Sequence, residues 1–579
     1  MSLSSFNRFK IAHSGLDIRR SKFTKNFEHK TTFKSGKLIP IYLDEIIAGD
    51  TMDINLASVM RSITPVVPVM DNAFVDFYFF FVPFRLCTVH EHDWEKICGE
   101  NFSSKWAPTT ESTLTTTGNN VSFNDLSKVE PCSLAHYMGL PIVDSATTAK
   151  FKNERVNTMP FVAYYKIWNE WFRDENNQDP IVIFDVNNVG VAASSLCDVN
   201  KYHDYFTSAL PSPQKGSSVL LPIAGLAPVR TRANSNVSEE TAAAYPGLRG
   251  YLSNGNDSTS YYGIGTGMAV PNLSIYSEAD EGITNENTFG SIDPSDSIEI
   301  EAETDMYRFI PSNLWADLKN TTAVSVNDLR YAFALQRFEE RNARGGTRYR
   351  EYLLSHFGVQ NGDLRLQVPE YLFGKHIPLT MSQVNQTSET GTSPLGATGA
   401  YSLSGFNERC FVKSFTEPGY ILGLACVRTE QTYSQGLPKL FTRDRQFDFY
   451  DPVFANIGEQ PIYSRELYLK GIDNSGTYHF DDVFGYNEAW AEYRFKANQV
   501  SGYLAPDAGD TTLTAWTYTN NFTAMPILNA DFIKQSDKNI ADTLVYSEAN
   551  YQFIADFYFQ VKATRPMPLY SIPGLIDHH

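Results

Sequence analysis

Apolar residues in this chain come in short runs broken by prolines, glycines and polar residues, a pattern that favours β-strands. The clearest strand is 73–84, AFVDFYFFFVPF. Its near-continuous apolar character indicates that both faces are covered, or that the exposed face meets another subunit. Similar runs occur at 38–43, 63–69, 419–428 and 553–561. Strands this distant in sequence, joined by long connections with short helices, predict an antiparallel sandwich of the jelly-roll kind.

Helical periodicity is confined to two regions. One predicts a core helix, from the spacing of Tyr164, Ile167, Trp168, Trp171 and Phe172. The other, Asn327 to His356, predicts a pair of helices. Asn327 suits a helix cap, Gly345-Gly346 breaks the pattern, and Gly358 suits the end of the second helix.

The middle of the chain has a different composition. From Asp185 to about Tyr307 it is rich in Ser, Asn, Gly, Thr and Ala, with weak periodicity. Such a stretch predicts a long surface insertion. The alternative is a flexible loop. A chain of 579 residues also exceeds what one core usually organises. The predicted organisation is an arm at 1–40, a first part of the sandwich at 41–231, a variable insertion at 232–307, and the rest of the sandwich at 308–579.

Charge separates the amino-terminal arm from the remaining chain. Residues 1–40 hold nine basic residues against two acidic ones, a net charge of +7, whereas the whole chain carries −18, leaving −25 for the rest. Basic residues interleaved with rings suit single-stranded nucleic acid, because cations pair with phosphates while rings stack on bases. The DNA-contact candidates are Arg8, Lys10, Arg19, Arg20, Lys22, Lys25 and Lys30, and the stacking candidates are Phe6, Phe9 and Phe23. The alternative is a solvated terminus that binds nothing.

Motifs for catalysis are missing from the sequence. It has no Walker A loop, no HExxH and no GxSxG, and no paired carboxylates stand out for an enzyme acting on glycans. We therefore predict no catalytic residue and no enzyme. The apolar run 77–84 is too short to span a bilayer, and no secretory signal is evident, so we expect a soluble protein made in a cytoplasm.

Two other clusters are open to more than one interpretation. Residues 174–179, DENNQD, could collect a divalent cation, but they lack the glycine and closing glutamate of an EF-hand, so no metal site or cofactor is predicted. Six arginines between Arg330 and Arg350 could form a sequence-specific reader of duplex DNA. Glu339, Glu340 and Glu351 favour ion pairs and a structural role for this segment instead.

Several longer motifs carry a family resemblance. They are HSGLDIRRS from His13, FFVPFRL from Phe80, IWNEWFRD from Ile167, NARGGTRYRE from Asn342 and FTRDRQFDFYDPVF from Phe441. In this order they resemble the major capsid proteins of microviruses, in the gokushovirus branch. The resemblance runs nearly end to end and falters mainly between Arg232 and Tyr307.

The resemblance implies a mainly β protein, an eight-stranded antiparallel jelly-roll sandwich with long inserted loops and a few short helices. It implies 60 copies in a T=1 icosahedral shell around circular single-stranded DNA, with the arm facing the interior and the insertion forming a protrusion at the threefold axes for attachment to a host receptor. The protein would be part of the virion, assembled in the cytoplasm of a bacterial host. Aromatic interface candidates are Phe447, Phe449, Tyr450 and Phe454.

The family also implies further partners, a small basic DNA-packaging protein and a minor capsid or pilot protein. Charge supports the first of these. Sixty arms supply about 420 positive charges, while a genome of a few kilobases carries a few thousand phosphates. The arms would neutralise roughly a tenth of them, so other cations are needed.

Overall fold

The chain forms two compact units, each described by itself. The computed structural model describes residues 19–87, 129–142, 159–181, 195–216, 326–358 (except 347), 367–389, 398–470, 480–509, 513–546 and 551–570, together with short strands and a few single residues elsewhere between 120 and 396. Unit 1 comprises Met1–Lys215 and Glu340–His579, and unit 2 comprises Gly216–Glu339. The predicted insertion at 232–307 falls within unit 2, and most of its residues lie outside the described part.

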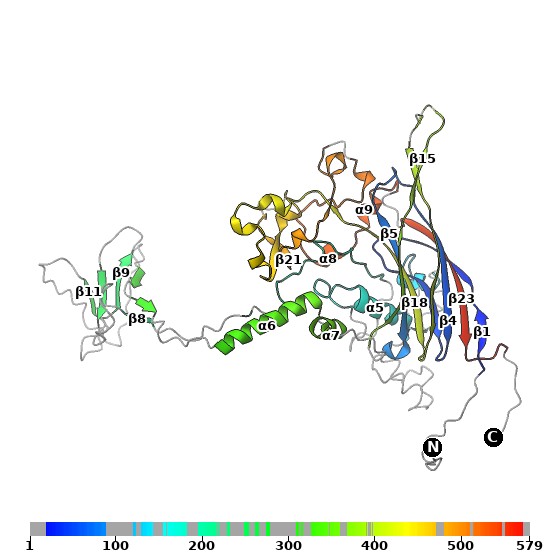
Figure 1. The fold of residues 1–579 in the computed structure, drawn as a ribbon, viewed down its shortest axis with the longest axis horizontal. Helices are drawn as coiled ribbons and strands as arrows, with labels where there is room; N and C mark the ends of the chain where they lie inside the picture. The colour runs from blue at the N-terminus through cyan, green and yellow to red at the C-terminus, as the bar shows by residue number, and fades with distance from the viewer. Residues whose placement is uncertain are drawn as a thin grey trace, which may run out of the picture. The chain divides into compact units, whose positions relative to one another are not determined.

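Two antiparallel sheets dominate unit 1 (Figure 1). The first sheet has the order β1-β23-β4-β17, and β2 also pairs with β23. Its strands are β1 (Ser21–Thr24), β2 (Phe27–Phe33), β4 (Thr51–Ser62), β17 (Ser404–Ser414) and β23 (Phe553–Arg565). The second sheet has the order β14-β5-β18-β3. Its strands are β3 (Ile39–Ile46), β5 (Ala73–Pro83), β14 (Glu370–Pro378) and β18 (Gly419–Thr429).

The main core lies between these sheets. In β4 every second residue is buried, among them Met52, Ile54 and Leu56, while the residues between them face outward. Phe557 and Phe559 of β23 enter the same core beside β5 and β18. The alternation of buried and outward residues makes one face of the first sheet apolar. This face packs against the second sheet, so the fold is a β-sandwich.

The second sheet is covered on its other face as well. A second core forms there from β5, β18 and the helix α5 (Met159–Ile167), which continues into the π-helical turn η5 (Trp168–Phe172). Phe80 and Val82 of β5 enter this core, whereas Phe77 and Phe79 enter the first. The prediction that both faces of 73–84 are covered is confirmed, as is the core role of Tyr164, Ile167 and Trp168.

The predicted strands at 38–43, 73–84, 419–428 and 553–561 are confirmed as β3, β5, β18 and β23. The one at 63–69 is wrong. Pro65 and Pro68 remove two N–H donors, and only an isolated bridge from Pro65 to Leu544 forms there. Strand β4 was missed because its outward positions include Asp53 and Asn55, residue types that are depleted in strands.

The predicted helix pair is confirmed as α6 (Val326–Gly345) and α7 (Tyr349–Phe357). Gly346, between the helices, has φ of +80°, and Gly358, after α7, has φ of +67°. Both are left-handed backbone conformations that side chains disfavour, which explains glycine at the break and at the end. Helix α6 begins at Val326, so the predicted cap Asn327 is already helical.

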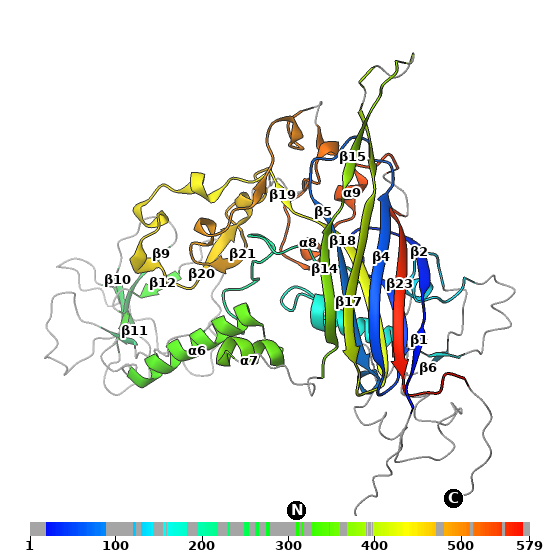
Figure 2. The same ribbon diagram turned by 45° about the vertical axis from the view of Figure 1, so that its right-hand side comes forward.

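Smaller elements complete the two units. Unit 1 also contains the hairpin β15 (Met381–Asn385) and β16 (Thr398–Ser402), the pairs β19 (Thr432–Tyr433) with β22 (Asn498–Gln499) and β20 (Glu459–Tyr463) with β21 (Val483–Glu488), strands β6 (Asn120–Ser122) and β7 (Arg155–Asn157), and the short helices α3 (Leu134–Tyr137), α8 (Ala530–Ile533) and α9 (Lys538–Ala541). The β15–β16 hairpin projects beyond the sandwich (Figure 2). Unit 2 contains the sheet β11-β10-β9-β12 and the pair β13-β8. Their bounds are β8 (Val229–Thr231), β9 (Leu248–Ser253), β10 (Tyr261–Gly265), β11 (Ser274–Ser277), β12 (Arg308–Pro311) and β13 (Leu314–Ala316).

One buried carboxylate stands out within the apolar strand β5. Asp76 accepts hydrogen bonds from Arg428 Nε at 2.8 Å and from the Tyr202 hydroxyl at 2.8 Å, and His376 Nδ1 lies 2.7 Å from its other oxygen. The side chains of Asp76 and Arg428 are 3% and 14% exposed. The buried charges of Asp76 and Arg428 are tolerated because each has a partner.

We expect Asp76→Asn to lower the free energy of unfolding by about 3 to 5 kcal/mol, because it leaves the buried Arg428 without a counter-charge. A matched control is Asp53→Asn, which breaks the cross-strand pair with Arg409, whose side chain is 60% exposed. This control should lower the free energy of unfolding by less than about 1 kcal/mol. Urea denaturation of the unassembled chain, followed by tryptophan fluorescence, measures both, and equal losses would contradict the role of burial.

Candidate functional site

The predicted arm is partly built into the sandwich. Strands β1 and β2 both pair with β23, so strand pairing begins at Ser21 rather than after Pro40. Phe23 lies opposite Ala563 and is half-buried, and Phe27 stacks on Phe559 at 5.0 Å between ring centroids. The register places Phe23 on the same face of the sheet as the core residue Ala563, while its side chain stays partly exposed.

Several basic residues of the arm are engaged within the chain. The ion pairs are Lys25–Asp44 at 2.7 Å, Lys30–Glu28 at 2.9 Å, Lys34–Asp537 at 3.5 Å, and Lys37–Asp198. Arg19, Arg20 and Lys22 are exposed and form no ion pair with other described residues. Arg8, Lys10, Phe6 and Phe9 lie outside the described residues. The cations best placed for a phosphate are thus those around the start of β1.

The outer face of the first sheet is partly basic, with exposed aliphatic side chains such as Val59 and Ile554 between its charged residues. Lys22 in β1 and Lys562 in β23 point to this face, as does Arg61 in β4, because their register partners alternate with core residues. Asp53 and Asp556 share the face, so its charge is mixed. Such a surface can contact phosphates but has no feature that reads base sequence.

A second candidate surface consists of exposed aromatic and aliphatic side chains in residues 440–457, which we call the aromatic surface. Val453 is 84% exposed and Phe447 is 70% exposed. The other exposed members are Leu440, Phe441, Phe449, Tyr450 and Ile457. All four predicted interface residues lie here. Phe454 is partly buried, and the centroid of its ring lies 5.7 Å from that of the Phe447 ring. A contiguous exposed patch of this kind is typical of a protein interface.

Local hydrogen bonds hold the aromatic surface in place. It is built from three 3-10 turns, Lys439–Thr442, Gln446–Asp448 and Pro452–Phe454. The Asp448 carboxylate accepts from the backbone N–H groups of Arg445 at 2.9 Å and Asp444 at 3.0 Å, which lowers the pKa of Asp448. Asp451 caps the last turn by accepting from Val453 N–H at 2.8 Å. The rings are therefore presented on a preorganised backbone, which lowers the entropy cost of binding.

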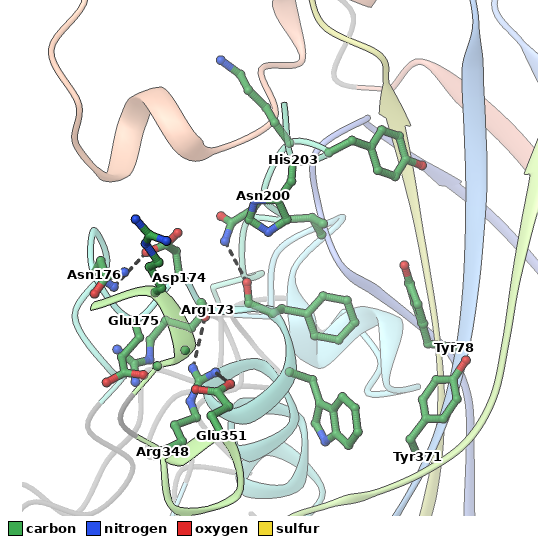
Figure 3. Close-up of a pocket in the computed structure, with 18 of the residues that line it drawn as sticks. Tyr78, Arg173, Asp174, Glu175, Asn176, Asn200, His203, Arg348, Glu351 and Tyr371 are labelled. Atoms are coloured by element: carbon green, nitrogen blue, oxygen red, sulfur yellow. Dashed lines mark hydrogen bonds and ion pairs between the residues drawn. The ribbon is translucent and has the colours of Figure 1, made fainter. Parts of the chain in front are cut away.

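The arginines near the α6–α7 break line a charged pocket of about 460 Å³. In Figure 3, Tyr78 and Tyr371 of the strands face Arg348, Glu351 and the turn at 173–176 across this pocket. Arg348 donates to the carbonyl of Asn169 at 2.7 Å and pairs with Glu351 at 3.2 Å. Arg344 pairs with Glu459. Arg344 and Arg348 therefore bind partners within the chain. This agrees with the structural interpretation of the segment and not with a DNA reader.

The possible cation ligands at 174–179 are also used locally. Asp174 Oδ1 accepts from the N–H groups of Asn176 at 2.8 Å and Asn177 at 2.9 Å, which closes its own turn. Within the described part of the chain, no cluster of three His, Cys, Asp or Glu side chains is arranged to hold a metal ion. In the same part, no helix is long and apolar enough to cross a membrane.

Sequence reasoning missed one neighbouring feature, the exposed rings of Tyr493 and Phe495 beside the aromatic surface. Arg443 lies 4.5 Å from the Tyr493 ring centroid and pairs with Glu492 at 3.0 Å, which joins the two segments. The residues 491–504 have no periodic pattern, so only their aromatic content, YRF followed by Tyr503, could have signalled a surface of this kind.

Comparisons with known proteins agree with the motifs. The family described as "Capsid protein (F protein)" matches residues 13–575. Capsid protein VP1 of Spiroplasma virus 4 is 35% identical, with 98% of this chain and 97% of the relative covered. Capsid protein VP1 of Bdellovibrio phage phiMH2K is 36% identical over 96% of this chain and 95% of the relative, and that of Chlamydia phage 1 is 33% identical over 96% of both. The chain therefore belongs to the F family of microvirus capsid proteins, which are structural components of the virion and not enzymes.

Proposed function

We propose that this chain is the major capsid protein that forms a T=1 icosahedral shell of 60 copies around circular single-stranded DNA. The observation that carries the proposal is the aromatic surface, where Phe447 and Val453 stay largely exposed in the single chain. Exposed apolar patches of this kind mark surfaces where another protein binds. In a shell, the partner is a neighbouring copy.

The strand order supports a jelly roll as the unit of the shell. In chain order the eight long strands are β2, β3, β4, β5, β14, β17, β18 and β23. They alternate between the sheets as β2-β23-β4-β17 and β3-β18-β5-β14, the arrangement of two nested Greek keys. The strand β1 extends the edge that β2 forms on β23. The long connections between the strands lie at the ends of the sandwich, where these connections can reach neighbouring copies.

The same proposal assigns different partners to other surfaces. Arg19, Arg20 and Lys22, with Arg8 and Lys10 preceding them, contact the DNA phosphates from the inner side of the shell. Unit 2, which contains 232–307, forms the protrusion at the threefold axes and binds a host receptor. A small basic packaging protein supplies further positive charge, and a minor capsid or pilot protein joins the particle. The amino-acid composition of 232–307, rich in Ser, Asn and Gly, supports an exposed recognition role.

Assembly is tested by removing apolar area from the aromatic surface. Sixty chains of 65.2 kDa make a particle of about 3.9 MDa, which mass photometry and electron microscopy detect. We expect the double variant Phe447→Ser/Val453→Ser to lower the yield of such particles at least about tenfold, because interface anchors of this size contribute roughly 1 to 2 kcal/mol each.

Val59→Ser is the matched control, since Val59 is half-exposed on the outer face of the first sheet. Particle yield should stay within about twofold for this variant. If the Phe447→Ser/Val453→Ser protein folds and assembles like the wild type, the aromatic surface is not an assembly interface. Monomers that never assemble, even with packaging partners and DNA, would contradict the shell itself.

The DNA role of the arm is tested at the three unpaired cations. We expect Arg19→Gln/Arg20→Gln/Lys22→Gln to weaken binding of a single-stranded oligonucleotide and to reduce the slope of log affinity against log salt by up to about 2, roughly 0.7 for each lost phosphate contact. Fluorescence anisotropy across a salt series measures this. The control is Lys30→Gln/Lys34→Gln, which removes lysines that already pair with Glu28 and Asp537. Equal slopes for the triple variant and the wild type would exclude this contact.

A further inference from the structure

A groove of about 730 Å³ lies beside the aromatic surface in unit 1. Its rim carries the exposed side chains of Leu440, Phe441, Tyr493 and Phe495, and Tyr433 lies buried at its base. The volume is in the range of about 300 to 1,000 Å³ that holds a ligand of several groups. Because rings line it on two sides, the groove suits an extended peptide better than a single side chain.

Two of the residues that line the groove, Ser434 and Arg443, each have a polar atom that is closed off from solvent and has no hydrogen-bond partner among the described residues, Ser434 Oγ and Arg443 Nε. The Arg443 side chain is only 8% exposed, fixed by its pair with Glu492 and by the Tyr493 ring. An unpaired buried donor costs about 1 to 3 kcal/mol. Because both atoms are covered by the protein, the groove offers an occupant contact with its rings and not these two donors.

Unit 1 also has an apolar segment without a visible partner, residues 566–570, Pro-Met-Pro-Leu-Tyr, which follow β23. Tyr570 is 74% exposed, and Leu569 and Met567 are exposed too. Pro566 and Pro568 lack N–H donors, so the segment cannot continue pairing as a strand, and its carbonyls stay available. Proline-containing extended segments are recognised by aromatic-lined grooves.

The start of this segment is fixed by Arg565. Its guanidinium donates to the Glu45 carbonyl at 2.8 Å and lies 3.2 Å from Asp50 Oδ2. The segment therefore leaves the sandwich at a defined place. In Figures 1 and 2, β23 ends at the lower edge of the sandwich, while the yellow and orange segments that carry the groove lie higher and on the other side. Tail and groove of one chain lie apart, an arrangement suited to contact between copies.

We infer that residues 566–570 of one copy bind in the groove between Phe441 and Tyr493 of a neighbouring copy, where their prolines and apolar side chains pack against the rings. This inference rests on the proposed shell and names one of its contacts. Tail and groove are different surfaces, so the contact is heterologous and repeats from copy to copy until a ring closes.

The test places a photoreactive group on the tail. Tyr570 is replaced by p-benzoyl-phenylalanine, particles are purified and irradiated, and cross-linked peptides are identified by mass spectrometry. Mixing isotopically heavy and light copies before assembly distinguishes links between chains from links within one chain. We expect links between chains that join residue 570 to peptides from 438–443 or 492–501.

Groove variants provide the second readout. Phe441→Ser/Tyr493→Ser should reduce the yield of this cross-link about tenfold, the change expected for losing about 1.4 kcal/mol of contact. The control probe stands at Tyr401, half-exposed on β16, and should not label the groove.

The outcomes separate the inference from the proposed function. Particles that form, but whose residue 570 links within its own chain or to another surface, overturn the inference and leave the shell intact. Labelling of the groove from both 570 and 401 overturns it as well. If no particles and no links between chains are found with the packaging partners and DNA present, the proposed function and this inference fail together.

Discussion

Burial of β5 on both faces is the constraint on which the rest of unit 1 depends. A strand with Phe77 and Phe79 on one side and Phe80 and Val82 on the other cannot stand at a solvent-exposed sheet face. The first sheet covers one side, and α5 with its π-helical turn covers the other. The burial of β5 therefore fixes where the long connection between β5 and β14 begins. The rest of this connection can form surfaces. Even Asp76, the polar exception in this strand, is accepted only because Arg428 and Tyr202 bind it.

The structure divides the exposed surface by chemistry. The outer face of the first sheet carries charges of both signs and a few exposed aliphatic side chains, whereas residues 440–457 and 493–503 carry many exposed rings, of which Phe449 and Tyr493 lie beside Arg443. A polar face tolerates water and mobile ions, while a ring-rich face gains free energy only by excluding water. On the proposed function, nucleic acid and neighbouring copies therefore contact separate regions of one chain and do not compete.

The sequence predicted those features that depend on local pattern. The strands with strong apolar runs, the α6–α7 break at Gly345-Gly346 and the ring-rich segment at 447–454 all follow from spacing or composition within a few residues. It did not predict which cations of the arm form ion pairs, because the partners Asp44 and Asp537 are distant in sequence and meet Lys25 and Lys34 only in the folded chain. Nor did it predict that Phe23 would lie opposite Ala563. Strand β4 shows the limit of composition, since its alternation was correct for a strand while Asp53 and Asn55 on its outward face are residue types depleted in strands.

The pairing of β2 with β23 has a consequence for the timing of synthesis. Phe27 lies opposite Phe559, a partner 532 residues later in the chain. The ribosome must make the chain as far as β23 before β4 gains this neighbour and the first sheet can close. A chain that ends before β23 leaves the backbone N–H and C=O groups along one edge of β4 unpaired. Synthesis of β23 thus acts as a checkpoint, since only chains that include it offer a finished sandwich to their neighbours.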